Sequence, residues 1–381
     1  MQSLHTFTRM ALIMGVALAI APPAVAATPY TFSPTGSLAT ARGGATATLL
    51  PNGDVLVAGG APNALGALAS AELYHPALGT FSNTGSMLAA RAGATATLLP
   101  SGDVLIAGGS PDGTNALASA ELYHPSLGTF TATGSLSAAR AAATATLLPG
   151  GDVLIAGGKD SAGYLASAER YHTGLFATTN PLATARGFAT ASLLSTGKVL
   201  IAGGQNAATP YLNSAELFDP SANSFSSTGA LTTARRKATA TVLTSGKVLI
   251  AGGKGASGVY LASAELYDPA AGTFAFTANN MVAARQVATA TLLPSGTVLL
   301  AGGQGTGNAI LASAELYDPA TAMFTATGPM ATARQFATAT LLPGGFVLVA
   351  GGADATTFGL ASAELYAGAS DVIFANGFES P

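Results

Sequence analysis

The feature that most constrains this chain is a glycine doublet that recurs through nearly all of its 381 residues. Successive doublets begin 46 to 50 residues apart, with an arginine 17 residues before each and a glutamate 11 or 12 residues after it. The doublets begin at residues 59, 108, 157, 203, 252, 302 and 351. A self-similar period near 50 residues indicates an array of supersecondary units that bury their faces against their neighbours.

Each unit contains several short segments with the composition of β-strands. In residues 91–140 these segments are 94–99, 104–107, 119–123 and 129–132, separated by turn sequences rich in Gly, Pro, Ser and Asp. No segment has a sustained helical period. The repeat therefore predicts an all-β fold, a seven-bladed β-propeller with four antiparallel strands in each blade.

The last copy of the repeat is incomplete, and the missing piece lies at the other end of the chain. The seventh unit reaches Glu364-Leu365-Tyr366 and then lacks a fourth strand. Residues 30–36 match residues 79–85, which contain the fourth strand of the first unit. We therefore expect the N-terminal strand to complete the last blade and close the ring, which leaves no large unpaired sheet edge.

The order of arginine, strand, diglycine, a strand with glutamate and an aromatic residue, and a second aromatic residue resembles the kelch motif. The resemblance covers about residues 30–366 and implies a propeller fold. The sequence departs from the motif because it contains no tryptophan. Phenylalanine stands in its place, at Phe81, Phe130, Phe176, Phe225, Phe274 and Phe324. A phenyl ring still fills the gap between sheets but lacks the indole donor.

Both ends of the chain differ from the repeats. Arg9 precedes an apolar run at residues 10–21, and small residues follow, so residues 1–26 are predicted to be a cleaved signal peptide. No later segment has the ~18 uninterrupted apolar residues of a membrane span. We expect residues 27–367 to form the propeller, exported to the periplasm, cell surface or medium. The tail, residues 368–381, ends in a pattern that resembles the C-termini of other exported bacterial proteins.

Composition excludes several classes of function. The net charge is −3 and only 9% of the residues are charged, so the chain lacks the basic field that binds nucleic acid. It has no cysteine, which excludes disulfides, thiol catalysis and cysteine-ligated metals. Some kelch-like propellers are copper oxidases whose radical site needs a cysteine cross-linked to tyrosine, so that activity is excluded here. We expect no cofactor.

The repeated arginines and glutamates have two interpretations. They are Arg42, Arg91, Arg140, Arg186, Arg235, Arg285 and Arg334, and Glu72, Glu121, Glu169, Glu216, Glu265, Glu315 and Glu364. The arginines either pair with the glutamates and with backbone carbonyls, or form a cationic ring at the channel mouth. Equal numbers and identical placement favour structural pairing. The glycine doublets are expected to meet a backbone requirement, either positive φ or close packing.

Three histidines occur at the same position of consecutive units. They are His75, His124 and His172, and the later units carry Asp219, Asp268 and Asp318 there. Outer turns of neighbouring blades should be roughly 15 Å apart, too far to share a metal ion, so no metal site is predicted. The preceding hairpin turns change from Asp54, Asp103 and Asp152 to Lys198, Lys247, Thr297 and Phe346. We interpret those turn positions as weakly constrained surface.

Sequence variation between units is concentrated on the side of the ring that carries the loop after each diglycine and the residues after each arginine. This pattern favours a non-catalytic binding module with a carbohydrate or protein ligand, and we expect a monomer. The predicted site is a patch on the fourth to seventh blades, formed by Phe188, Arg236, Lys237, Gln286, Gln335, Phe336, Tyr211, Tyr260 and Phe358. The alternative is an enzyme of the sugar mutarotase kind, for which the candidate acid–base groups are Asp112, Asp160 and Asp354.

Overall fold

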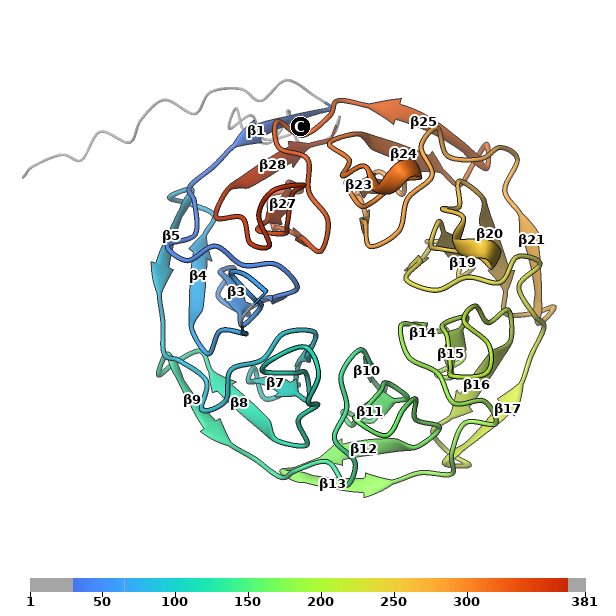
Figure 1. The fold of residues 1–381 in the computed structure, drawn as a ribbon, viewed down its shortest axis with the longest axis horizontal. Helices are drawn as coiled ribbons and strands as arrows, with labels where there is room; N and C mark the ends of the chain where they lie inside the picture. The colour runs from blue at the N-terminus through green and yellow to red at the C-terminus, as the bar shows by residue number, and fades with distance from the viewer. Residues whose placement is uncertain (1–29, 65, 369–381) are drawn as a thin grey trace, which may run out of the picture.

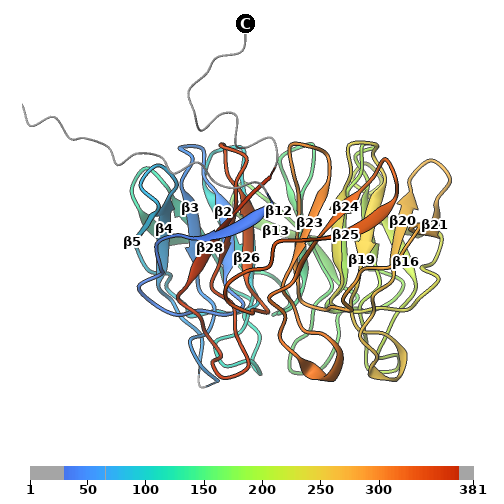
Figure 2. The ribbon, with the colours of Figure 1, turned by 90° about the horizontal axis from the view of Figure 1, so that it is seen from above.

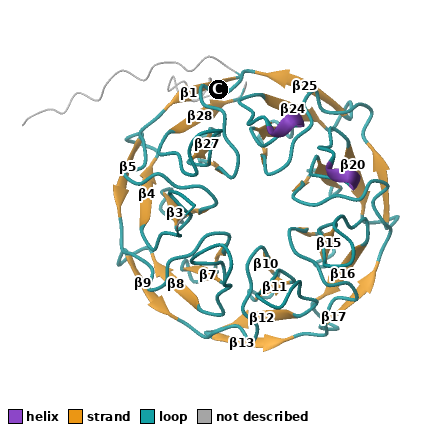
Figure 3. Ribbon diagram, in the orientation of Figure 1, coloured by secondary structure: helices purple, strands orange, loops and turns teal. Residues whose placement is uncertain are grey.

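The computed structural model describes residues 30–64 and 66–368, and the statements below concern those residues. Its strands form seven four-stranded sheets arranged as the blades of a ring (Figure 1). The helical elements in this part of the chain are two short 3-10 turns, η1 (Ala256–Gly258) and η2 (Thr306–Asn308), drawn in purple in Figure 3. The predicted seven-bladed, all-β propeller is confirmed.

Every blade repeats the same antiparallel order from the channel outward. The innermost strands are β2 (Thr46–Leu49), β6 (Thr95–Leu98), β10 (Thr144–Leu147), β14 (Thr190–Leu193), β18 (Thr239–Val242), β22 (Thr289–Leu292) and β26 (Thr338–Leu341). The second strands are β3 (Val55–Ala58), β7 (Val104–Ala107), β11 (Val153–Ala156), β15 (Val199–Ala202), β19 (Val248–Ala251), β23 (Val298–Ala301) and β27 (Val347–Ala350). The third strands are β4 (Ala71–His75), β8 (Ala120–His124), β12 (Ala168–His172), β16 (Ala215–Asp219), β20 (Ala264–Asp268), β24 (Ala314–Asp318) and β28 (Ala363–Ala367). The outermost strands are β5 (Thr80–Asn83), β9 (Thr129–Ala132), β13 (Leu175–Thr178), β17 (Ser224–Ser227), β21 (Thr273–Phe276), β25 (Met323–Thr327) and β1 (Thr31–Pro34).

The hydrophobic core lies between neighbouring blades. The second strand of each blade is buried along its whole length, because both of its faces pack against another sheet. Leu56 and Ala58 of β3, for example, pack with Val104 and Ile106 of β7. The phenylalanine that replaces the kelch tryptophan packs on the tyrosine or phenylalanine of the adjacent third strand, with ring centroids 4.8–5.0 Å apart. A phenyl ring therefore suffices to fill this gap.

The ring is closed by the N-terminal strand, as predicted. Strand β1 pairs antiparallel with β28, with Thr31 opposite Ala367 and Pro34 opposite Glu364. Phe32 packs on Tyr366 with ring centroids 4.9 Å apart, in the same way as the phenylalanines of the other blades. The predicted signal peptide and all but the first residue of the C-terminal tail lie outside the described residues.

A buried ion pair in each blade holds the connection that arrives from the preceding blade. In the fifth blade Arg235 donates from Nη2 to Oε1 of Glu265 at 2.8 Å, and the other pairs measure 2.6–2.8 Å. Nη1 of Arg235 also donates to two backbone carbonyl oxygens, and Glu265 accepts from two backbone N–H groups of the connection. The seven guanidinium groups are about 1% exposed, so they do not form a cationic ring available to a ligand.

The glycine doublets meet both backbone requirements that the sequence suggested. In the first blade the φ angles are 67° at Gly59 and 84° at Gly60, in the left-handed region. A Cβ atom on Gly59 would lie 2.3 Å from the carbonyl oxygen of Arg91 in the next blade. A side chain at this position would therefore push neighbouring blades apart.

The interpretation of the turns between the first and second strands as weakly constrained surface is wrong for the first five blades. Nδ1 of His75 lies 3.0 Å from Oδ1 of Asp54, and the second and third blades repeat this contact at 2.9 and 2.6 Å. In the fourth and fifth blades the acidic and basic residues exchange positions. Lys198 and Lys247 lie in the turn and pair with Asp219 and Asp268 at 3.0 and 3.1 Å. In the first five blades the turn residue and the residue opposite it thus change together, which keeps a polar pair across the strands.

Within the described part of the chain, no helix has both the length and the apolar character that a transmembrane span requires.

Candidate ligand-binding face

One face of the ring, here called the variable face, carries both segments that differ between blades. These are the loops after the diglycines, at residues 61–64 with 66–68, 110–117, 159–165, 205–212, 254–261, 304–311 and 353–360, and the two residues after each repeat arginine. The two segments meet through isolated β-bridges such as Arg236 to Lys254 and Gln286 to Gln304. Figure 2 shows the loops with η1 and η2 projecting from one side of the ring. The expected clustering of these segments on one face is confirmed.

A closed ring of backbone hydrogen bonds surrounds the channel mouth on this face. The second residue after each repeat arginine donates its N–H to the carbonyl oxygen of its counterpart in the preceding blade, over 3.0–3.3 Å. The members of this mouth ring are Gly44, Gly93, Ala142, Phe188, Lys237, Val287 and Phe336. Each residue lies two positions before an innermost strand, so the hydrogen bonds connect the blades around the axis.

All seven members of the mouth ring have left-handed backbone, with φ between 47° and 65°. Glycine adopts this conformation freely, whereas other residues pay roughly 1–2 kcal/mol. The first two blades carry glycine, but four of the later blades carry phenylalanine, lysine, valine and phenylalanine. Strain of this kind is concentrated at functional sites, so large side chains at the mouth of blades four to seven point to a role beyond the scaffold.

Lys237 lies between two aromatic rings at the mouth. Its Nζ is 5.0 Å from the ring centroid of Phe188 on the preceding blade and 5.6 Å from that of Phe336, two blades further on. These are cation–π distances. Lys237 is half-buried, whereas Phe336 remains 41% exposed. The three side chains therefore make one aromatic and cationic surface that reaches across the mouth.

Arg236 extends this surface outward along the fourth and fifth blades. Its guanidinium carbon lies 5.1 Å from the ring centroid of Tyr211, and its Nη1 donates to the side-chain oxygen of Gln205. The amide of Gln205 in turn donates to the hydroxyl of Tyr164. Tyr164 lines a hollow of about 390 Å³ between blades three and four, so this row of hydrogen-bonded side chains connects the mouth to that hollow.

The charges at the mouth are unbalanced. Burial lowers the pKa of Lys237, and the positive charges of Arg236, Lys254 and Lys159 lower it further. These four are the basic residues of the described chain that form no ion pair, since the other ten all contact a carboxylate. The unpaired positive charge of the described chain is thus gathered on the variable face.

The predicted patch is only partly assembled. Phe188, Lys237 and Phe336 meet directly, and Arg236 lies against Tyr211, as described above. The remaining four members are dispersed over the later blades: Gln286, which is 6% exposed, half-buried Gln335 and Tyr260, and Phe358, which is 63% exposed. Gln286 donates to Gln304 over 2.8 Å, and its own side-chain oxygen has no partner in the described residues.

Two cations of the site were missed from the sequence, Lys159 and Lys254. Nζ of Lys254 lies 4.7 Å from the ring centroid of Tyr260, and the tyrosine hydroxyl donates to Asn308. Both lysines immediately follow a glycine doublet, opposite the first variable residue after the arginine. Their position in the repeat could have identified them. The residue after each doublet pairs with the first residue after the repeat arginine, and so lies on the variable face.

The three aspartates proposed as acid–base groups accept hydrogen bonds from backbone N–H groups of their own loops. Oδ1 of Asp160 accepts hydrogen bonds from the backbone N–H groups of Ala162 and Gly163. Hydrogen bonds from backbone N–H groups, chiefly those of Asn115 and Thr356 respectively, lower the pKa of Asp112 and of Asp354 to about 2. A general base works best with a pKa near the working pH, so neither carboxylate is tuned for proton transfer at neutral pH.

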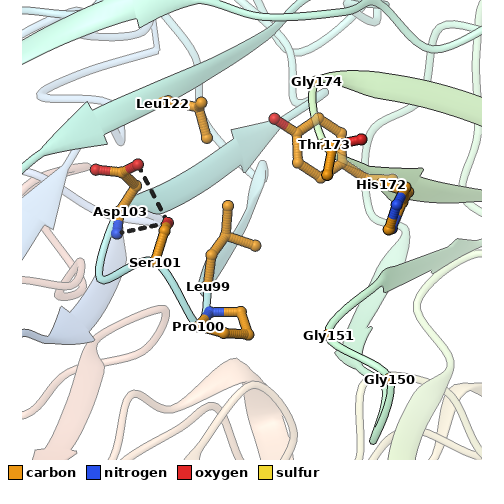
Figure 4. A pocket seen from close by; sticks show the side chains of 11 residues that line it. Leu99, Pro100, Ser101, Asp103, Leu122, Gly150, Gly151, His172, Thr173 and Gly174 are labelled. Atoms are coloured by element: carbon orange, nitrogen blue, oxygen red, sulfur yellow. Dashed lines mark hydrogen bonds between the residues drawn. The ribbon is translucent and has the colours of Figure 1, made fainter.

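The opposite face has a separate hollow that the sequence did not indicate. It measures about 490 Å³, lies between the second and third blades, and is lined by residues such as Leu99, Pro100, Leu122 and His172 (Figure 4). The outer hairpin of the third blade is two residues shorter than its counterparts, with Thr173-Gly174 as its turn, which opens this space. His172 contacts Asp152 through Nδ1 only, whereas the two equivalent histidines also hydrogen-bond through Nε2.

Comparison with known proteins agrees with this architecture. The kelch motif matches residues 189–230. A solved structure of a novel fungal alcohol oxidase of the AA5 family, in complex with copper, is similar with a TM-score of 0.71 and 18% identity, over 89% of this chain and 76% of that one. At this identity the likeness shows the fold alone. No curated protein sequence matches the chain. The motif match and the seven-bladed architecture together show that the chain is a kelch-repeat β-propeller.

Proposed function

We propose that this propeller is an exported, non-catalytic binding module that takes a carbohydrate or protein ligand on its variable face and acts as a monomer. The observation that carries the proposal is the mouth ring. Four of its positions hold large side chains in a backbone conformation that favours glycine, and three of those side chains form one continuous surface. Uniform scaffold combined with variation at one surface is the arrangement by which repeat folds present a binding site.

The combination of aromatic faces and polar donors supports a ligand with both apolar and hydrogen-bonding surfaces. Phe188, Phe336 and Tyr211 offer ring faces, while Arg236 and Lys237 offer donors beside them. The low pKa values of Asp112 and Asp354 argue against the mutarotase alternative. A mutarotation assay on common sugars tests that alternative directly, and catalysis above the uncatalysed rate would contradict the non-catalytic proposal.

A thermal-shift screen against sugars, cell-wall fragments and peptides should identify a ligand that raises the melting temperature. We expect the combined substitution Arg236→Ala and Lys237→Ala to lower the affinity for that ligand by about tenfold or more, since it removes two charged donors. The matched control is Lys198→Ala with Lys247→Ala, which removes two lysines paired with aspartates on the opposite face. Unchanged affinity in the first variant, measured by calorimetry, would remove the variable face from consideration.

A further inference from the structure

Four half-buried cations near the channel mouth lack a counter-charge among the described residues: Lys159, Arg236, Lys237 and Lys254. Removing a charge from water without pairing it raises the free energy of the folded state. The rest of the propeller follows the opposite rule, because every other described cation has a carboxylate partner. The exception is confined to the variable face, which also carries the left-handed mouth ring.

The acidic residues on this face do not neutralise the cluster. Seven glutamates are buried against the repeat arginines. Asp112, Asp160 and Asp354 accept hydrogen bonds from the backbone of their own loops and form no ion pair with the four cations. The positive potential at the mouth is therefore available to a charge that comes from outside the described chain.

The mouth ring is asymmetric in side-chain size. Its members on the first three blades are Gly44, Gly93 and Ala142. A Cβ atom added to Gly44 or Gly93 would meet no heavy atom within 4 Å, so these two blades leave space at the mouth. The later blades present Lys237 and the two phenylalanine rings there.

Building on the proposed binding function, we propose that the channel mouth is an oxyanion site that receives a carboxylate or phosphate group of the ligand. Nζ of Lys237 donates to that group, and the positive charges of Arg236, Lys254 and Lys159 add attraction. The rings of Phe188 and Phe336 flank the ammonium group at 5.0 and 5.6 Å.

The test uses the purified chain and calorimetric titration with citrate, pyrophosphate and the neutral sugar galactose. We expect citrate or pyrophosphate to bind, and the better of the two identifies the carboxylate or phosphate source. Lys237→Gly should weaken that binding by about tenfold or more, because it removes a charged donor. Its fold is not at risk, since glycine occupies the same mouth-ring position in two other blades. Lys247→Gln on the opposite face is the control and should bind like the parent.

Two results would overturn the oxyanion site, and they differ in what they imply for the binding function. No binding of either anion at about 10 mM, a concentration that detects millimolar affinity by mass action, removes the oxyanion site. If a neutral sugar or peptide still depends on Arg236 and Phe336, the binding face stands without it. Binding of an anion that Lys237→Gly leaves unchanged also overturns the proposal, and shows an adventitious anion elsewhere.

The pH dependence gives an independent readout. The groups that face Lys237 are the cations Arg236, Lys254 and Lys159 and the rings of Phe188 and Phe336, and its pKa is lowered from the usual 10.5. Anion affinity should therefore fall with rising pH at lower pH than for an ordinary lysine. Lys237→Arg keeps its charge, so its anion affinity should fall less with rising pH than that of the parent. Equal profiles for the parent and this variant would contradict the role of Lys237.

The unliganded chain should show the opposite trend. Because the pKa of Lys237 is lower in the folded chain than in the unfolded chain, the unfolded state binds more protons between the two pKa values. Stability without ligand therefore increases as the pH rises through this range, relative to Lys237→Arg, while anion affinity decreases. Denaturant titrations of both proteins at several pH values measure this difference.

Discussion

Deleting residues 27–40 is expected to destabilise the whole ring by on the order of 5 kcal/mol or more, because it removes a packed phenylalanine and several ladder hydrogen bonds. Among the described residues, strand β1 is the only partner of β28 on its outer side, and Phe32 packs on Tyr366 there. The deletion also removes the backbone N–H groups of Ala39 and Thr40, which donate to the buried carboxylate of Glu72. One truncation thus opens the last blade and loosens the first.

The measurement is the melting temperature of the truncated chain, with gel filtration to detect association through the exposed edge of β28. A synthetic peptide of residues 27–40 added in trans is the control. It should restore the melting temperature in a concentration-dependent way, because an extended peptide can complete an open sheet. A truncated chain that melts like the parent would show that the ring does not depend on this closure.

Strand positions and ring closure could be predicted from the sequence because both follow from the repeat. The strands expected at 94–99 and 119–123 are Thr95–Leu98 and Ala120–His124, and the other two strands of that blade match their predicted bounds. Because the same pattern occurs seven times, the ambiguity of assigning a strand in one copy is resolved by the others. The repeat period and the β-propensity then indicate the same strands. The matching ends of the chain supplied the closure.

The pairing of side chains was less accessible. The His–Asp and Lys–Asp pairs join the turn between the first and second strands to the end of the third strand, and so bring together residues about 20 positions apart, such as Asp54 and His75. Each position alone changes from blade to blade, and the constraint is visible only when both are compared in register. Variation at one position therefore hides a polar pair that the register keeps in the first five blades.

The candidate site depended on contacts between blades, which a single repeat does not reveal. Lys237, Phe188 and Phe336 come from three different blades and meet because the ring brings equivalent positions around one axis. Lys159 and Lys254 join them through backbone bridges to the variable residues. The sequence placed most of these residues on one face. Their order around the mouth and their left-handed backbone required the structure.

The substitution Arg235→Ala is expected to destabilise the fold by about 3–5 kcal/mol, the typical cost of removing one partner of a buried ion pair. Arg235 donates from Nε to Thr233, from Nη1 to Gly252 and Ser263, and from Nη2 to Ser263 and Glu265. Burial lowers the pKa of this arginine, and Glu265 opposes that shift. Without the guanidinium, the fully buried carboxyl group of Glu265 retains only its two backbone donors.

Urea denaturation of four variants, Arg235→Ala, Glu265→Gln, the two combined and Lys247→Ala, separates this explanation from a simple loss of packing. Lys247→Ala removes a half-exposed cation from its pair with Asp268 and should leave the free energy of unfolding nearly unchanged. Adding Glu265→Gln to Arg235→Ala should recover part of the lost stability, because it removes the uncompensated charge and keeps the side chain's volume. If the double variant is as unstable as the sum of the two single variants, the cost does not come from an orphaned carboxylate. The arginines would then stabilise the ring chiefly through their hydrogen bonds to the glycine doublets.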